Sequence, residues 1–198
     1  MSTSTSLNLQ AILKTAVTRT AMINPAKRIT GLSGAAKAFF VAATAHALPG
    51  AVIAYIVPTD RSVEQAVADV RFFLASLESL SGAAADGAVL SFPSHEVDPF
   101  RGMAPHLGVT SARARALYAI GSGTARVVVA SASALLPKVS GVDRLLAASV
   151  ELTPGRDLSP VALADILVDA GFSREDPVDE HGEFAVRGGI VDVYPPAE

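Results

Sequence analysis

Apolar and polar residues alternate along the first two thirds of the chain in blocks that predict strands followed by helices. Continuous apolar runs occupy residues 51–57, 88–92 and 126–130, and turn-forming residues bound each of them. Short runs of this kind are typical of strands buried in a parallel sheet. Between the first two runs, apolar residues recur at alternating spacings of four and three, as on the buried face of a helix: Val63, Val67, Val70, Leu74 and Leu77.

Three further segments predict helices: residues 7–20, 35–48 and 111–120. Ser111 is the expected N-cap of the last one, and Thr59 or Asp60 is the expected N-cap of the helix before residue 80. Strands that alternate with helices indicate an α/β domain built on a parallel sheet with flanking helices.

The pattern changes after about residue 132 and predicts a second, smaller α+β domain. Residues 148–152 are a candidate strand, and Ser159-Pro160 is a strong helix start, because a capping residue precedes proline at the first helical position. Two strand pieces, 183–187 and 190–194, flank Gly188-Gly189, which we interpret as a bulge or bend. We therefore divide the chain into a tail at 1–24, an α/β domain at 25–133 and a small domain at 134–198.

Composition excludes several classes of function. Of the 198 residues, 50% are hydrophobic and 18% are charged, so the chain is too apolar to be disordered. The absence of cysteine excludes disulfides and thiol catalysis, and four scattered histidines predict no metal site. The net charge of −3 and the absence of tryptophan argue against a domain that wraps nucleic acid. With no signal peptide or membrane-spanning run in view, we expect a monomeric cytoplasmic protein.

The segment Gly31-Leu-Ser-Gly34-Ala-Ala36-Lys37-Ala38 partly matches a phosphate-binding loop, G-x-x-x-x-G-K-[ST]. Gly31 and Lys37 are in place. Ala36, however, stands where the second glycine allows close approach of phosphate, and Ala38 stands where a hydroxyl would hold magnesium. Taken alone, the segment is also compatible with an ordinary glycine turn before a helix. As a phosphate loop, we expect Gly31, Gly34 and Lys37 to be vestigial, and we identify no catalytic residue elsewhere in the chain.

This partial phosphate-loop segment is the first of five motifs whose order along the chain is informative. The second is Val-Leu-Ser-Phe-Pro-Ser-His-Glu at residues 89–96, with Pro-Phe at 99–100, and the third runs from Ser-Ala-Arg to Leu at 111–117. The last two are Val-Val-Val-Ala-Ser-Ala-Ser-Ala-Leu-Leu at 127–136 and Gly-Glu-Phe-Ala-Val-Arg-Gly-Gly-Ile-Val-Asp-Val-Tyr-Pro-Pro at 182–196. Together they resemble the N-terminal UvrB-like module of the transcription-repair coupling factors (the Mfd family). UvrB itself is similar, but its phosphate loop is intact and its second strand is followed by a tyrosine-rich hairpin. Residues 94–109 here contain no tyrosine.

The resemblance implies a non-catalytic module that recruits UvrA for nucleotide excision repair where RNA polymerase has stalled at a lesion. It implies no cofactor for this fragment. In the parent protein, which we expect to continue beyond residue 198, it implies an ATP-dependent translocase on double-stranded DNA that uses Mg-ATP. The alternative is a UvrB-like domain for damage recognition that retains some ATP binding. A DNA-binding fragment is a third reading, against which the charge and the scarcity of aromatic residues argue.

The same resemblance assigns partner-binding residues. In UvrB, arginines of the small domain contact UvrA, and Arg174 and Arg187 match two of their positions, whereas Ala185 replaces a third. Strand alternation independently places Phe184 and Val186 on the core face and Ala185 and Arg187 on the outer face. A solvated arginine, or one paired locally with Asp176, Asp179 or Glu183, is the alternative for each position. Glu180 and Glu183 are candidates to orient the arginines.

Four basic residues around the long loop are a weaker candidate group: Arg101, His106, Arg113 and Arg115. They could contact DNA phosphates or close the nucleotide pocket. Arg113 and Arg115 are two residues apart and so do not share a helix face, which favours a mixed, solvated surface.

Overall fold

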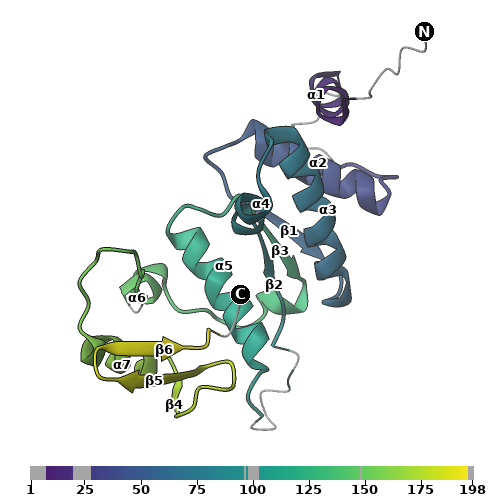
Figure 1. Cartoon of the computed structure of the whole chain (residues 1–198). Coiled ribbons are helices and arrows are strands. Elements are labelled where there is room, and N and C mark those ends of the chain that lie inside the picture. Colours follow the sequence, from purple (N-terminus) through teal and green to yellow (C-terminus); the bar gives the residue numbers. More distant parts are fainter. Residues whose placement is uncertain (1–7, 20–27, 96, 98–102, 148, 196–198) are drawn as a thin grey trace. The chain divides into compact units, whose positions relative to one another are not determined.

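The computed structural model describes residues 8–19, 28–95, 97, 103–147 and 149–195, and the chain forms two compact units (Figure 1). The first unit comprises Met1–Ser94 and Ser122–Pro137, and the second comprises His95–Gly121 and Lys138–Glu198. Each unit is described by itself below.

A three-stranded parallel sheet forms the centre of the first unit, as the alternating pattern predicts. Strands β1 (Ile53–Val57), β2 (Val89–Phe92) and β3 (Val127–Ser131) lie in the order β1-β3-β2. The middle strand β3 is buried throughout its length. The expectation that all three strands are buried is wrong for β1, whose alternate residues Ala54 and Ile56 face solvent, with Ile56 42% exposed.

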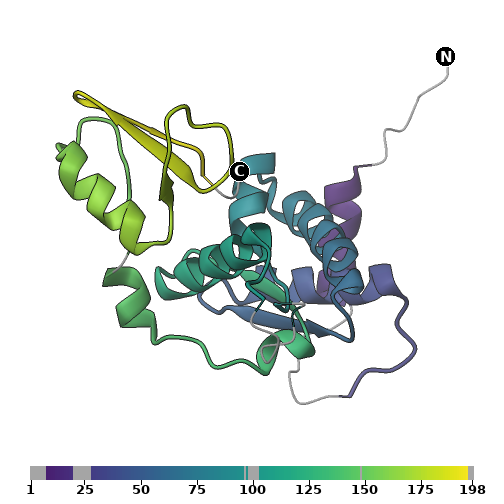
Figure 2. The same cartoon turned by 90° about the horizontal axis from the view of Figure 1, so that it is seen from below.

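Helices α2 (Gly34–Ala47) and α3 (Arg61–Glu78) pack against each other and against this sheet. All five residues of the predicted stripe on α3 are buried, and Leu74 and Leu77 are completely enclosed. Helix α1 (Leu9–Arg19) lies beside α3 (Figure 2), where Leu13 joins the core and Gln10 donates to the Leu77 carbonyl and to the Ser79 hydroxyl. The unit also contains α4 (Gly82–Ala88) and a short 3-10 turn at Ser133–Leu135.

A buried polar junction ties the ends of α2 and α3 to the start of β3. The Arg126 guanidinium donates to both carboxylate oxygens of Glu78, at 3.1 and 3.2 Å, and to the Ala45 carbonyl at 2.6 Å. His46 Nδ1 lies 3.1 Å from the same carboxylate. Because Glu78 and Arg126 are mostly buried, this junction holds three elements in register at one end of the sheet.

The second unit contains a small mixed sheet and three helices, which confirms the predicted small α+β fold. Strand β5 (Glu183–Arg187) lies between β4 (Ser173–Arg174), which is parallel to it, and β6 (Ile190–Val193), which is antiparallel. Helix α7 (Pro160–Asp169) packs on this sheet through a core in which Leu163 and Leu167 meet the fully buried Phe184. Helices α5 (Leu107–Gly121) and α6 (Val142–Ala147) pack together in the same unit.

Several local predictions for the second unit are wrong at their boundaries. Residues 149–152 form no strand. Helix α5 begins at Leu107 rather than near Ser111, and His106 Nδ1 accepts the Gly108 N–H at 3.1 Å, so the ring of His106 satisfies an amide at the helix start. Gly188-Gly189 form the two-residue turn of a hairpin, for which the φ of +61° at Gly188 suits glycine.

The N-caps predicted for α3 and α7 also differ in detail. Asp60 precedes α3 and Ser159 precedes α7, but neither side chain bonds to a helical amide. Thr59 instead shares a hydrogen bond with the Ser62 hydroxyl, at 3.0 Å. The Asp60 carboxylate is engaged elsewhere, as described below.

The predicted domain limits, 24/25 and 133/134, stay predictions about evolutionary modules. The compact units differ from them in that α5 groups with the second unit. Among the residues that the structure describes, no helix is both long and apolar enough to cross a bilayer.

Candidate functional site

The predicted phosphate-loop residues lie at the start of α2 in the first unit. Gly31 has a φ of +79°, and Gly34 is the first residue of the helix. The Ser33 hydroxyl accepts the Ala36 N–H at 3.4 Å, so one amide that a phosphate would use is already satisfied within the chain. The Ala38 methyl group is 1% exposed and belongs to the core. The segment therefore has the turn of a phosphate loop without its metal-binding hydroxyl.

An open hollow of about 590 Å³ adjoins this segment. The described residues that line it are mostly apolar, and Lys37 is the one cation among them. The lining consists of Ile29, Thr30, Gly31, Leu32, Lys37, Phe40, Val41 and Tyr55. Burial raises the pKa of the Tyr55 hydroxyl, and the charge of Asp69 raises it further, so this group stays neutral. One lysine in apolar surroundings is poorly suited to the several negative charges of a nucleotide triphosphate.

Asp60 connects the carboxyl ends of the strands, an arrangement that sequence reasoning missed. Its carboxylate accepts the Ser94 N–H at 2.8 Å, the Ser94 hydroxyl at 2.7 Å and the Ser133 hydroxyl at 3.3 Å. Burial opposes the charge, but hydrogen bonds from Ser94, Ser131 and Ser133 outweigh it and hold the pKa of Asp60 below its ordinary value. The available sequence signal was a polar residue within three positions after each apolar run: Asp60, Ser94 and Ser131. Within the described ranges, no group of three or more His, Cys, Asp or Glu side chains is placed to hold a metal ion.

The two predicted partner-binding arginines are both exposed and lie in the small sheet of the second unit. Arg174 is in β4, in register with Phe184 of β5, and Arg187 ends β5. Paired residues of parallel strands point to the same face, so Arg174 shares the face of Phe184, whereas Arg187, three positions further along, points to the opposite one. The structure therefore places the two arginines on one sheet but not on one face.

Arg187 is paired with acids of its own chain. Its Nε donates to Asp176 Oδ2 at 3.2 Å and its Nη2 donates to Asp176 Oδ1, while Asp192 Oδ2 lies 4.0 Å from Nη1. These hydrogen bonds lower the pKa of Asp176 and raise that of the Arg187 guanidinium. The local partner considered from the sequence is thus present, and it fixes the direction of the guanidinium.

Two details of the predicted outer face are corrected. Ala185 is 2% exposed and so does not face solvent, although strand alternation alone predicts that it does. Glu183 does not orient either arginine, because its carboxylate accepts the N–H groups of Asp179 and Glu180, each at 2.9 Å. It orders the turn that leads into β5.

In the weaker basic group, His106 and Arg115 are exposed, as the sequence favours, but Arg113 is not. Arg113 is 4% exposed, and its charge, together with burial, lowers the pKa of His95. His106 caps α5, and Arg101 lies outside the described residues. Arg113 is thus a buried residue of the second unit, which its position two residues from Arg115 did not predict.

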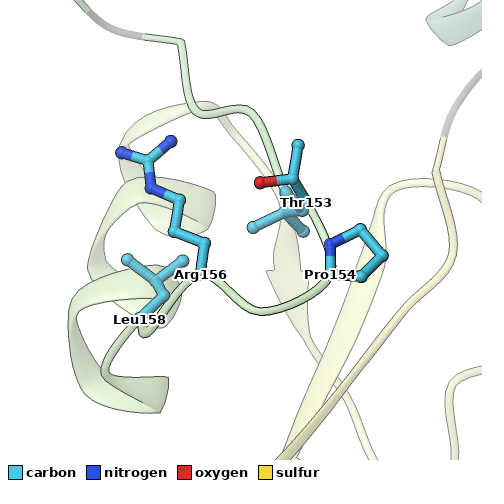
Figure 3. Close-up of a pocket in the computed structure, with 5 residues that line it drawn as sticks. Thr153, Pro154, Arg156 and Leu158 are labelled. Atoms are coloured by element: carbon cyan, nitrogen blue, oxygen red, sulfur yellow. The ribbon is translucent and has the colours of Figure 1, made fainter.

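A second hollow, of about 330 Å³, lies in the loop before α7. Figure 3 shows Arg156 and Leu158 on one side of it and Thr153 and Pro154 on the other. The Arg156 guanidinium donates to the Glu151 carbonyl at 3.1 Å, so it braces the loop. The lining contains no acid, base or nucleophile in an arrangement for catalysis.

Comparison with known proteins adds two findings. Residues 150–198 match the model of the UvrB interaction domain, and they include α7 and the whole small sheet. The chain is also similar to transcription-repair-coupling factors: that of Myxococcus xanthus is 31% identical over 170 residues, and that of Bacillus subtilis is 28% identical over 172 residues. These alignments cover 85% and 84% of this chain, respectively.

A shorter alignment, with the factor of Escherichia coli, is 30% identical over 110 residues and covers 56% of this chain. The chain spans only 14%, 13% and 10% of the three relatives, respectively. The ordered motifs, the two folds and these alignments agree: the chain is homologous to transcription-repair-coupling factors and carries a UvrB interaction domain at residues 150–198.

Proposed function

We propose that this chain is the UvrA-recruiting, non-catalytic module of a transcription-repair-coupling protein. The observation that carries the proposal is the match of residues 150–198 to the UvrB interaction domain, on which Arg174 and Arg187 are both exposed. Arginine suits such a contact because its planar fork presents several N–H donors to a partner.

The start of α2 supports the non-catalytic part of the proposal. The helix is capped by Ser33, and the position of the magnesium-binding hydroxyl is a buried methyl group at Ala38. Among the described residues that line the adjoining hollow, Lys37 is the only cation. Such a site lacks the metal-binding hydroxyl and the paired cationic donors that phosphoryl transfer needs. Nucleotide hydrolysis is therefore assigned to other parts of the parent protein.

In the parent protein, the proposal places this module beside motor domains that use Mg-ATP to move along double-stranded DNA and to displace a stalled RNA polymerase. The module would then bring UvrA to the lesion and so begin nucleotide excision repair. The names of the relatives support the coupling of transcription to repair, and the UvrB-like domain supports a partner among the repair proteins.

Co-migration with UvrA on a sizing column tests the proposal. The purified chain mixed with UvrA is expected to elute with it, whereas a chain carrying both Arg174→Ala and Arg187→Ala is expected to elute separately. Circular dichroism of the double variant controls for folding. Separate elution of the wild-type chain at micromolar concentrations of both proteins would overturn the proposal.

The alternative, a domain that retains nucleotide binding, is favoured by one feature: Lys37 lines a hollow next to a glycine turn. Calorimetric titration with Mg-ATP distinguishes the two functions. The proposal predicts no hydrolysis and no heat of binding at micromolar nucleotide. Saturable binding that is lost in Lys37→Ala, together with turnover, would support the alternative.

A further inference from the structure

The outer face of the β5–β6 hairpin exposes two large apolar side chains. Val191 and Val193 pack on the core beneath α7, so Ile190 and Asp192 point to the opposite face, and Tyr194 continues this alternation. Ile190 is 64% exposed and Tyr194 is 36% exposed. The Arg187, Ile190, Asp192 and Tyr194 side chains form what we call the outer face.

The register of the hairpin brings these residues together. Arg187 lies opposite Ile190, and Ala185 lies opposite Asp192. The Tyr194 ring contacts the His181 ring at a tilt of 46°, with 4.2 Å between the ring centroids, and the Tyr194 N–H donates to the Glu183 carbonyl at 2.9 Å. An exposed aromatic ring that is already held in place loses little conformational freedom on binding, as is common at interfaces.

The charges of the outer face do not balance. A single guanidinium, that of Arg187, faces the carboxylates of Asp176 and Asp192, which leaves one excess negative charge. Asp176 takes two N–H donors of Arg187, whereas Asp192 is 4.0 Å from Nη1, beyond hydrogen-bond distance. Within the described part of the chain, the Asp192 carboxylate accepts no hydrogen bond, and half of its side chain is exposed. Among the described residues, the charge on this surface that has no hydrogen-bonded partner is therefore the negative charge of Asp192, and not the positive charge of Arg187.

We propose that the outer face docks a partner that places a basic side chain on Asp192 and packs apolar groups on Ile190 and Tyr194, while Asp176 positions Arg187. This rests on the proposed function in taking UvrA as the partner. The three N–H donors of Arg187 that Asp176 does not use remain available for carbonyl oxygens of the same partner.

The position of Asp176 gives the proposal a distinctive consequence. Without the Asp176 carboxylate, the Arg187 guanidinium turns to the one acid still near it, Asp192, because opposite charges attract over a few ångströms. Asp192 then shares its charge with Arg187 and holds the partner's cation less strongly. If Arg187 instead recognised an acidic group of the partner, both aspartates would compete with that group, and removing either would strengthen binding.

The two schemes predict opposite signs for the same variants. Affinity for UvrA is measured by calorimetry for the wild-type chain, Asp192→Asn, Asp176→Asn and Asp165→Asn, the last being a matched loss of one exposed carboxylate on α7. The proposal predicts that Asp192→Asn weakens binding roughly 5- to 50-fold, that Asp176→Asn weakens it by a smaller factor and that Asp165→Asn changes it less than twofold. Raising the salt concentration should weaken the wild-type complex more than the Asp192→Asn complex.

Two outcomes overturn the inference in distinguishable ways. Tight binding of the wild-type chain together with unchanged or stronger binding of Asp192→Asn contradicts the role of Asp192 and leaves the proposed function standing. No binding of UvrA by the folded wild-type chain contradicts both. Weakening in the Asp192→Asn and Asp176→Asn chains, but not in Asp165→Asn, supports the inference.

Discussion

The surroundings of Arg187 determine which contacts its side chain can make. The strand pattern places it at the end of an exposed strand, and the structure adds Asp176, which holds its guanidinium in one direction. An exposed ion pair of this kind contributes little to folding, because water and salt screen it. Its main effect is to hold the Arg187 guanidinium in one direction, so that its remaining N–H donors face a binding partner in a fixed orientation.

Replacing Arg187 by alanine should weaken UvrA binding roughly tenfold or more, because the partner loses the donors of the fork. The melting temperature should change little, since the side chain is exposed. Calorimetric titration and a thermal melt measure the two effects. Arg61→Ala, at the exposed start of α3, is the matched control, and an Arg187→Ala chain that binds as tightly as this control would exclude Arg187 from the interface.

Asp60 predicts a pH dependence of folding in the first unit. Its pKa in the folded state lies below the ordinary value of 3.8, so its contribution to stability is complete above that value and is lost as the pH falls through the folded-state pKa. Asp60→Asn should lower the free energy of unfolding by about 1–3 kcal/mol at pH 7, because the hydrogen bonds from Ser94 and Ser133 to a charged acceptor are lost.

Urea unfolding of the wild-type and Asp60→Asn chains at pH 7 and pH 3 checks this dependence. The difference between the two chains should shrink on acidification. A difference that is the same at both pH values would show that the charge of Asp60 is not what stabilises the strand ends.

At the scale of elements, periodicity predicted what depends on burial alone. The stripe of α3, the three strands of the parallel sheet and the start of α7 at Pro160 were predictable, because each follows from apolar spacing or from a local cap signal. The exposure of one face of β1 was not, since its run of apolar residues looks the same as that of the buried edge strand β2. The burial of Ala185 and Arg113 was not either, because it depends on distant segments.

Of the candidate site, the sequence predicted the exposed positions of Arg174 and Arg187 and the turn at Gly31. It could not predict which of several nearby acids pairs with Arg187, because Asp176, Asp179 and Glu183 all precede it within a short stretch, and the acid that pairs is the most distant of the three along the chain. Only the folded hairpin distinguishes them, by directing Glu183 to the amides of its own turn. Side-chain partners over such short separations depend on backbone direction as well as on distance.

The Arg126 side chain, at the start of β3, connects three elements of the first unit, because it contacts Glu78 of α3 and Ala45 of α2. Arg126→Ala should lower the free energy of unfolding by about 3–5 kcal/mol, because it removes the guanidinium from the mostly buried Glu78 carboxylate and leaves the His46 ring beside it. Urea unfolding followed by circular dichroism measures the loss. Arg61→Ala is the control, since Arg61 is exposed at the start of α3. An equal loss in both variants would contradict the special weight of the junction.

At the scale of the whole molecule, the two units carry different kinds of surface. The first has a glycine turn, a capped helix and a largely apolar hollow, and the second has an exposed hairpin with charged and apolar groups. The proposed division of labour follows: the first unit has lost the groups for phosphate chemistry, and the second keeps the groups for docking. The two units together correspond to a small part of the much longer transcription-repair-coupling factors to which the chain is homologous.

Hydrogen exchange of the chain with and without UvrA tests the central claim most directly, because it reports where a partner binds. The account predicts slower exchange of the backbone amides of Ser173–Arg174, Glu183–Arg187 and Ile190–Val193 in the presence of UvrA, with residues 28–40 unchanged. Protection of residues 28–40 in place of the small sheet, or no protection anywhere at saturating UvrA, would contradict it.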